Sequence, residues 1–245
     1  MSDGVERDAG ARISSGAVSY ELTGVVAVVR IDDGKANALT PELIGEVNAA
    51  LDRAEREAHA VVVTGRPGRF SAGFDLAIMR QGGDATLGLT ASGGELACRL
   101  FGFPRPVVLA CTGHAIAMGA VLLCSGDVRL GADGDFKIGL NETANGMTLP
   151  VFALELARER LAPEHLTRAT LMAEIYDPKG AVAAGFLDSV VAPDAIETAA
   201  LATAARLAKI PSAAFAGSKL RLRGAVIDFV RRTLPEDMRR FARGE

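Results

Sequence analysis

The stretch Phe70-Ser-Ala-Gly-Phe-Asp-Leu76 follows closely on the β-branched run Ala60-Val-Val-Val-Thr64, and together they decide the fold. The run predicts a buried strand, and the small residues after it predict a sharp turn into a helix start. The same order returns where Val107–Cys111 leads into Gly113-His-Ala-Ile-Ala-Met-Gly119. A helix start has several N–H groups without partners and a partial positive charge. Two such turns that converge would bind an oxygen that gains negative charge, as an oxyanion hole does.

Strands and helices alternate on both sides of these turns. Val25–Ile31 predicts a strand, and the helix after it has Thr40 as its expected cap and Pro41 as its first residue. An apolar helix around Gly119–Cys124 and a strand at Val128–Leu130 continue the pattern. This alternation is typical of an α/β protein.

Three other stretches have less specific patterns. Residues 80–95 contain five glycines and are expected to be mobile, either as a lid over a site or as a surface loop. The basic and apolar tail from Lys219 onward is interpreted as a solvated amphipathic helix, with a phosphate or subunit contact as the alternative. Beyond Pro150 the chain is expected to be helical, with four leucines in the core: Leu154, Leu161, Leu166 and Leu171.

The composition is that of an ordinary globular protein. The 245 residues are 49% hydrophobic and 23% charged, and the net charge of −3 gives no electrostatic reason to expect nucleic acid as a partner. No apolar run is long enough to predict a membrane span. Three cysteines without metal-ligand spacing and a polar N-terminus, Met1–Asp8, favour a cytoplasmic location.

The two turns belong to a larger set of segments that resembles the enoyl-CoA hydratase/isomerase family, also called the crotonase family. The turn at Gly113 extends in the same pattern to Asp127. Three further segments match in order: Lys35-Ala-Asn-Ala-Leu39, Phe136-Lys-Ile-Gly-Leu-Asn-Glu142 and Ala184-Gly-Phe-Leu-Asp188. The resemblance therefore runs from about residue 20 to residue 190.

The resemblance implies a fold, a ligand and an assembly. The expected fold is an α/β spiral of ββα units over residues 1–190, followed by a helical C-terminal region over residues 191–245 that helps to form trimers. The expected ligand is an acyl-CoA thioester, with coenzyme A as part of the substrate, no further cofactor and no metal. The expected assembly is a homotrimer or a hexamer.

The resemblance also assigns roles by position. The backbone N–H groups of Phe74 and Met118 correspond to the oxyanion hole, and the backbone around Ala72 and Asp75 to the place that holds the adenine end of CoA. The side chain of Asp75 is expected to bond backbone at a turn.

Hydratases of the family use two glutamates, and this chain departs from that pattern. A count without gaps from Gly113 to Asp127 places Val121 at the first glutamate position, and valine cannot transfer a proton. The second position corresponds to Glu142, with Asn141 in place of a proline. In an apolar pocket the pKa of Glu142 would rise toward neutrality, which suits an acid/base catalyst.

One base and an oxyanion hole suffice to move a double bond, so isomerisation of an enoyl-CoA fits these residues best. Hydration by a substitute for the missing glutamate is an alternative. An acyl-CoA-binding protein without turnover is another, as is a thioesterase or carbon–carbon bond hydrolase. Asn145, Thr148 and Glu155 are weaker candidates for polar contacts in the pocket, and His114 is expected to support its turn.

Overall fold

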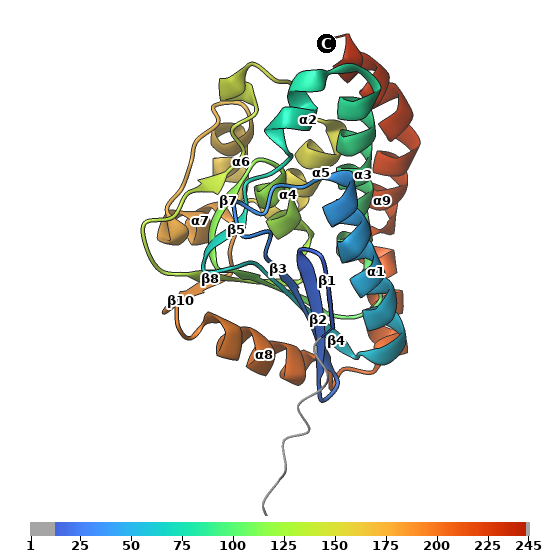
Figure 1. Ribbon diagram of the computed structural model, residues 1–245, viewed down its shortest axis with the longest axis vertical. Coiled ribbons are helices and arrows are strands. Elements are labelled where there is room, and N and C mark those ends of the chain that lie inside the picture. The colour runs from blue at the N-terminus through green and yellow to red at the C-terminus, as the bar shows by residue number, and fades with distance from the viewer. Residues whose placement is uncertain (1–12, 244–245) are drawn as a thin grey trace, which may run out of the picture.

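The computed structural model describes residues 13–243, so the N-terminal segment interpreted above lies outside the described residues. Two sheets form its centre (Figure 1). The larger has the order β1-β2-β3-β4-β6-β8-β10, with β1–β3 antiparallel and the rest parallel. Its strands are β1 (Ile13–Ser15), β2 (Val18–Thr23), β3 (Val26–Ile31), β4 (Ala60–Thr64), β6 (Val107–Cys111), β8 (Val128–Ala132) and β10 (Ser189–Val191). The smaller is parallel, with the order β5 (Gly68–Ser71), β7 (Gly113–Ile116) and β9 (Ile138–Gly139).

The chain passes from the large sheet to the small sheet and then into helix, three times in succession. In these passages β6 pairs with both β4 and β8, and β7 pairs with both β5 and β9. The helical parts that follow are α2 (Leu76–Gln81) with α3 (Gly83–Gly102), then α4 (Met118–Ser125), then the short 3-10 helix η1 (Thr143–Asn145) with α5 (Val151–Arg160). This confirms the predicted spiral of ββα units, and it brings the three segments after β5, β7 and β9 together.

The helix α1 (Pro41–Glu57) begins where the sequence predicts. The Thr40 hydroxyl accepts a hydrogen bond from the N–H of Leu43 at 3.2 Å, and Pro41 is the first helical residue. The apolar positions Leu43, Val47 and Leu51 are buried against the sheet core. Cap and periodicity together explain why this element was predictable.

The glycine-rich stretch at residues 80–95 is mostly helical, which corrects the expectation of a lid or a surface loop. Helix α3 spans Gly83–Gly102 and is separated from α2 by Gly82 alone. Its buried face contains Leu89, Leu96 and both Gly93 and Gly94. Glycine has low helix propensity, so packing rather than propensity holds this helix in place.

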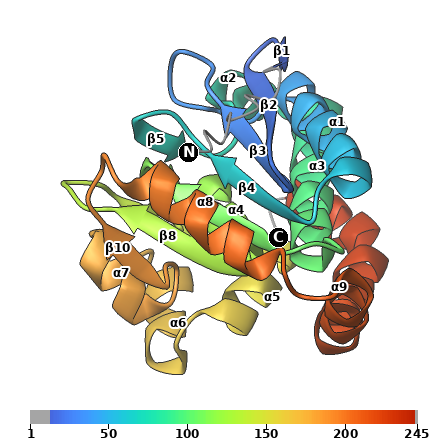
Figure 2. The same cartoon turned by 90° about the horizontal axis from the view of Figure 1, so that it is seen from below.

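The C-terminal helices pack on both sides of the core. Figure 2 shows α8 (Ile196–Leu207) lying across one face of the large sheet, where Ile196, Ala200 and Ala204 pack against Val62 and Val108. The long helix α9 (Ser212–Ala242) runs beside α3 and α5. The two remaining helices are α6 (Pro163–Thr170) and α7 (Pro178–Ala184).

The basic tail does not form a wholly solvated helix. The Nζ of Lys219 and the Nη1 of Arg223 each lie 2.8 Å from a carboxylate oxygen of Asp127, and both side chains are less than a tenth exposed. Asp127 also accepts the N–H of Val107 at 2.8 Å. This buried cluster ties α9 to the start of β8, so part of the basic pattern is structural.

The predicted leucine core beyond Pro150 is only partly correct. Leu161 is buried, and Leu154 and Leu166 are half-buried against the core. Leu171 is 63% exposed, because α6 ends at Thr170 and the chain turns outward there. The prediction from helical periodicity is therefore wrong for the residue that follows the end of the helix.

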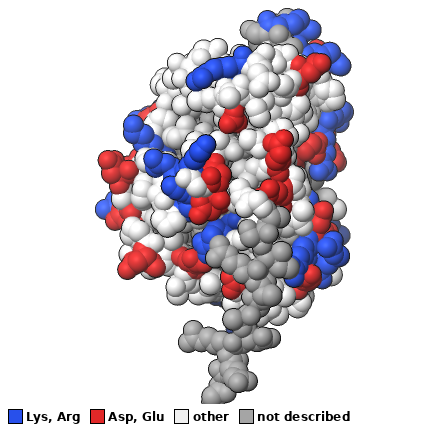
Figure 3. All heavy atoms as spheres, viewed as in Figure 1, with Lys and Arg blue, Asp and Glu red and all other residues white. Residues whose placement is uncertain are grey.

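Charged side chains of both signs are interspersed on the face in Figure 3, in keeping with the small net charge. Over residues 13–243, none of the helices combines the length and the apolar character that a membrane crossing requires.

Candidate active site

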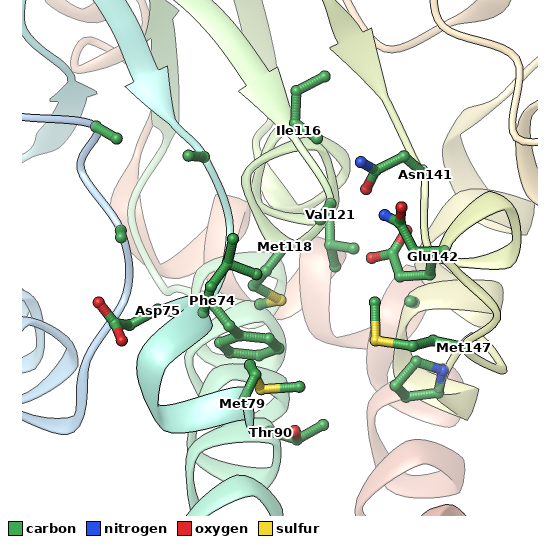
Figure 4. Close-up of a pocket in the computed structure, with 18 of the residues that line it drawn as sticks. Phe74, Asp75, Met79, Thr90, Ile116, Met118, Val121, Asn141, Glu142 and Met147 are labelled. Atoms are coloured by element: carbon green, nitrogen blue, oxygen red, sulfur yellow. The ribbon is translucent and has the colours of Figure 1, made fainter. Parts of the chain in front are cut away.

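A cavity of about 650 Å³ lies where the segments after β5, β7 and β9 meet α3, α5 and the end of α9 (Figure 4). This volume is in the range of small-molecule sites. All six residues of the predicted site contribute to its lining: Ala72, Phe74, Asp75, Met118, Val121 and Glu142. The fold therefore gathers residues that are up to 70 positions apart in the sequence.

The segment after β5 holds Phe74 in extended backbone. Leu39 forms a parallel bridge with Phe74, in which the Leu39 N–H donates to the Gly73 carbonyl at 2.8 Å and the Asp75 N–H donates to the Leu39 carbonyl at 2.9 Å. Successive N–H groups of an extended chain point to opposite sides, so the N–H of Phe74 points away from Leu39. It has no acceptor within the described part of the chain.

Met118 presents the second N–H group. It is the first residue of α4, where N–H groups lack a partner within the helix, and over residues 13–243 its N–H donates to no other group. Ala117 before it has φ 53° and ψ −124°, a conformation that an L-residue rarely adopts. A Cβ built on Gly73 would lie 3.1 Å from the Met118 nitrogen, so the backbone before Phe74 runs directly past this helix start.

Glu142 lies just after β9 and is only 9% exposed. Its Oε2 atom has no hydrogen-bond partner among the described residues. Burial raises the pKa of the Glu142 carboxyl to about 7, although the backbone N–H groups of Glu142 and Asn141 partly offset the effect. A carboxyl with this pKa can both accept and return a proton near neutral pH.

Val121 is 1% exposed and lines the same cavity from α4. Figure 4 shows its side chain projecting toward the region between Met118 and Glu142. The wall at this position is therefore aliphatic and has no group that can transfer a proton.

The other candidates divide into cavity residues and structural residues. Asn145 and Thr148 line the cavity. Glu155 is not in the lining and instead pairs with Arg158 at 2.8 Å, so its proposed reach into the pocket is wrong. Asp75 caps α2 by accepting the N–H groups of Ala77 and Ile78 at 2.8 and 3.0 Å.

His114 supports the strand beside it, because its Nδ1 accepts the N–H of Lys137 at 2.9 Å. Asp127 has the structural role described above.

Three comparisons with known proteins give the family of this chain. The enoyl-CoA hydratase/isomerase family profile matches residues 21–241, which is most of the chain. The chain belongs to the enoyl-CoA hydratase/isomerase family. A solved structure of a family protein from Pseudomonas syringae is 44% identical, covers 91% of this chain and 97% of its own, and has a TM-score of 0.89.

Two relatives of this family have names that specify isomerases. A solved Mycobacterium tuberculosis structure, described as an enoyl-CoA isomerase, is 40% identical over 91% of this chain and 98% of its own, with a TM-score of 0.87. The human mitochondrial enoyl-CoA delta isomerase 1 is 28% identical over 91% of this chain and 74% of its own length. Membership makes this chain an enzyme of the hydratase/isomerase family, and the resemblance found in the sequence is confirmed.

Several lining residues of this family member were not identified from the sequence. All of them lie outside the matched motifs: Met79 in α2, Thr90 in α3, Phe152 in α5, Phe241 in α9, and Met147 in the segment between η1 and α5. Each occupies an ordinary apolar or helical position, so no local signal distinguishes it from a core residue. Only the packing of α2, α3, α5 and α9 around the cavity shows their place.

Proposed function

We propose that this protein is an enoyl-CoA isomerase that moves a double bond with Glu142 as its only acid/base group. One observation carries the proposal: Glu142 is a buried carboxylate with a raised pKa and an oxygen that has no hydrogen-bond partner among residues 13–243. The two other carboxylates in the lining are occupied at turns. Asp75 caps α2, and Asp33 accepts the N–H groups of Lys35 and Asn37 at 2.7 and 2.9 Å.

The proposed reaction starts from a 3-enoyl-CoA. The thioester oxygen accepts hydrogen bonds from the N–H groups of Phe74 and Met118, which stabilise negative charge on that oxygen. The Glu142 carboxylate removes a proton from C2, and the electron pair of that C–H bond moves into a dienolate. Glu142 then returns the proton to C4, and the double bond moves from C3 to C2. One carboxyl group thus serves both proton transfers, and no water is consumed.

Hydration places a different demand on the site. It needs a water held beside C3 and a proton delivered to C2, for which the family uses two glutamates. Val121 stands where the first of these is expected, and it is buried in an aliphatic wall. This difference favours isomerisation over hydration. Asn145 and Thr148 are the lining groups that would have to hold a water in a hydratase.

The test compares two substrates with the purified protein. Conversion of a 3-enoyl-CoA should exceed hydration of a trans-2-enoyl-CoA of equal length. Glu142→Gln should lower kcat for isomerisation by about 10³-fold or more, because the amide cannot accept the proton. Faster hydration than isomerisation would identify a hydratase. Tight binding of acyl-CoA without turnover of either substrate would identify a binding protein. Full activity in Glu142→Gln would rule out the assigned role.

Two further expectations accompany this proposal. The adenine end of CoA is proposed to lie against the backbone at Ala72 and Asp75, at the edge of the same cavity, and no other cofactor is required. The protein is proposed to assemble as a homotrimer or hexamer, as the family resemblance implies. Size-exclusion chromatography with light scattering would give the mass of the assembly. A mass equal to that of one chain would contradict the proposed trimer or hexamer.

A further inference from the structure

Two adjacent glycines on the buried face of α3 support two aromatic rings of the cavity. A Cβ built on Gly93 would lie 2.4 and 2.5 Å from the Cε1 and Cζ atoms of Phe74. A Cβ built on Gly94 would lie 2.8 Å from the Cδ1 of Phe152. Both rings line the cavity. The rings therefore occupy the space that side chains at these two positions would fill.

The side chain of Met118, the second oxyanion residue, also lies close to Gly93. The methyl group of Met118 would be 3.5 Å from a Cβ at Gly93, which is ordinary contact distance. In the view of Figure 4 the Phe74 ring is drawn below Met118 and above Met79 and Thr90. The side chains of both N–H donors thus extend toward the same point of α3.

The end of the cavity next to this ring is suited to a hydrocarbon chain. Met79 and Phe152 line the cavity and are apolar, and Phe152 packs at Gly94, next to Gly93 in the helix. The hydroxyl of Thr90 donates to the carbonyl of Thr86 at 2.8 Å, so it is used within the helix. Met side chains adapt to irregular apolar ligands.

A glycine in a helix interior lowers helix stability relative to alanine, so its presence requires a compensating gain in packing or function. At Gly93 the displaced atoms would be the far edge of a half-buried ring. The open volume beside that ring is the cavity, so a methyl group at Gly93 would push the ring into it. At Gly94 the displaced atoms include the Cγ of Phe152, where the fully buried ring joins its side chain. A rotation of that ring would not move Cγ away from the added methyl group.

We infer that Gly93 is a specificity-determining residue, which sets how long an acyl chain the cavity accepts by leaving room for the Phe74 ring. The inference rests on the proposed function only in taking an acyl-CoA as the ligand. The expected ligand class is a thioester with an unbranched hydrocarbon chain that passes the Phe74 ring.

The test measures binding rather than turnover. Saturated acyl-CoA thioesters of increasing chain length are titrated calorimetrically into the full-length protein. Affinity for the unaltered protein should rise by up to about fourfold per added methylene until the cavity is full. In Gly93→Ala this rise should stop at a shorter chain, whereas affinity for the shortest thioester should stay the same.

Gly88→Ala is the matched control. Gly88 lies in the same helix, is exposed, and has nothing within 4 Å of a built Cβ. This variant should gain helix stability and keep the chain-length dependence of the unaltered protein. The inference would be overturned if Gly93→Ala weakened the binding of every thioester by the same factor. It would also be overturned if affinity depended on chain length in the same way as in the unaltered protein.

A second variant covers the case in which Gly93→Ala does not fold. Phe74→Leu removes the ring edge while the backbone N–H stays, and it should extend the rise in affinity to longer chains. If affinity stops rising at the same chain length as in the unaltered protein, the inference is overturned. Binding that depends on chain length without isomerase turnover would refute the proposed function and leave this inference standing. Absence of acyl-CoA binding to the unaltered protein would refute both.

Discussion

Gly73 passes so close to the start of α4 that a Cβ on it would lie 3.1 Å from the amide nitrogen of Met118 and 2.9 Å from the Cβ of Ala117. With φ at +87°, Gly73 has a backbone conformation that only glycine adopts at little cost. The next residue is Phe74. The close approach of two backbones therefore positions both N–H groups that are proposed to hold the thioester oxygen.

Gly73→Ala is expected to damage catalysis more than binding. The added methyl group must push the start of α4 away and so misalign the two donors. Loss of one oxyanion donor typically costs about 10²–10³-fold in kcat. We expect kcat to fall by about 10²-fold with a smaller change in KM, measured by steady-state kinetics.

Gly68→Ala controls for backbone strain in that experiment. Gly68 has φ +79° in the same segment, but nothing lies within 4 Å of a built Cβ. It should lower the melting temperature without a comparable loss of kcat. Equal losses of kcat in both variants would show that strain, rather than the approach to Met118, is responsible.

The pH dependence of isomerisation should report the ionisation of Glu142. The proposed base acts as a carboxylate, and burial raises its pKa to about 7. kcat/KM should therefore rise about tenfold per pH unit below this value and level off above it. A pH–rate profile across this range measures the inflection. An inflection near the ordinary glutamate value of about 4.3 would contradict a pKa of Glu142 raised by burial.

Glu142→Gln is expected to alter the pH dependence of stability as well. With a raised pKa, the folded protein binds a proton over a range in which the unfolded chain has released it. Glu142 therefore does not lower the stability below about pH 4, and the stability falls as pH rises to about 7. Above about pH 7 the free energy of unfolding is lower by about 3–4 kcal/mol than it would be without the shift. Urea unfolding of both proteins should show the variant gaining relative stability as pH rises, and a constant difference would contradict this.

Ala117→Gly is expected to stabilise the fold. Ala117 has φ 53° and ψ −124°, a strained conformation for an L-residue. The free energy gained by relieving the strain should exceed the free-energy cost of the extra entropy that glycine gives the unfolded chain. The net gain should be about 1 kcal/mol in unfolding free energy. Ala120→Gly, inside α4, should instead lose about 1 kcal/mol. A loss of stability in Ala117→Gly would mean that the methyl contact with the neighbouring backbone matters more than the strain.

Removal of the Asp127 carboxylate should destabilise the contact between α9 and the core. Asp127→Ala leaves the buried cations of Lys219 and Arg223 without their partner, which typically costs about 3–5 kcal/mol. The comparison is Glu95→Ala, which breaks an exposed pair with Arg231 and should cost less than about 1 kcal/mol. Chemical denaturation measures both. If both variants lost a similarly small amount of unfolding free energy, apolar packing alone would hold α9 against the core.

Local chemistry explains which parts were predictable. Thr40, Pro41 and the apolar period fixed α1, and the β-branched runs fixed β4 and β6. The glycines of α3 misled the prediction because their low propensity is outweighed by packing against Phe74 and other neighbours. Leu171 misled it because periodicity does not report where a helix ends.

The sequence by itself determined the family, the ββα order and the positions of Phe74, Met118, Val121 and Glu142, because these depend on motifs of neighbouring residues. The tertiary structure alone decided three features of the described residues: Glu142 is buried with an oxygen that has no partner among them, Lys219 and Arg223 are buried, and Gly93 packs against a cavity ring. The physical reason is that desolvation and close packing depend on segments distant in the chain, which no local pattern specifies.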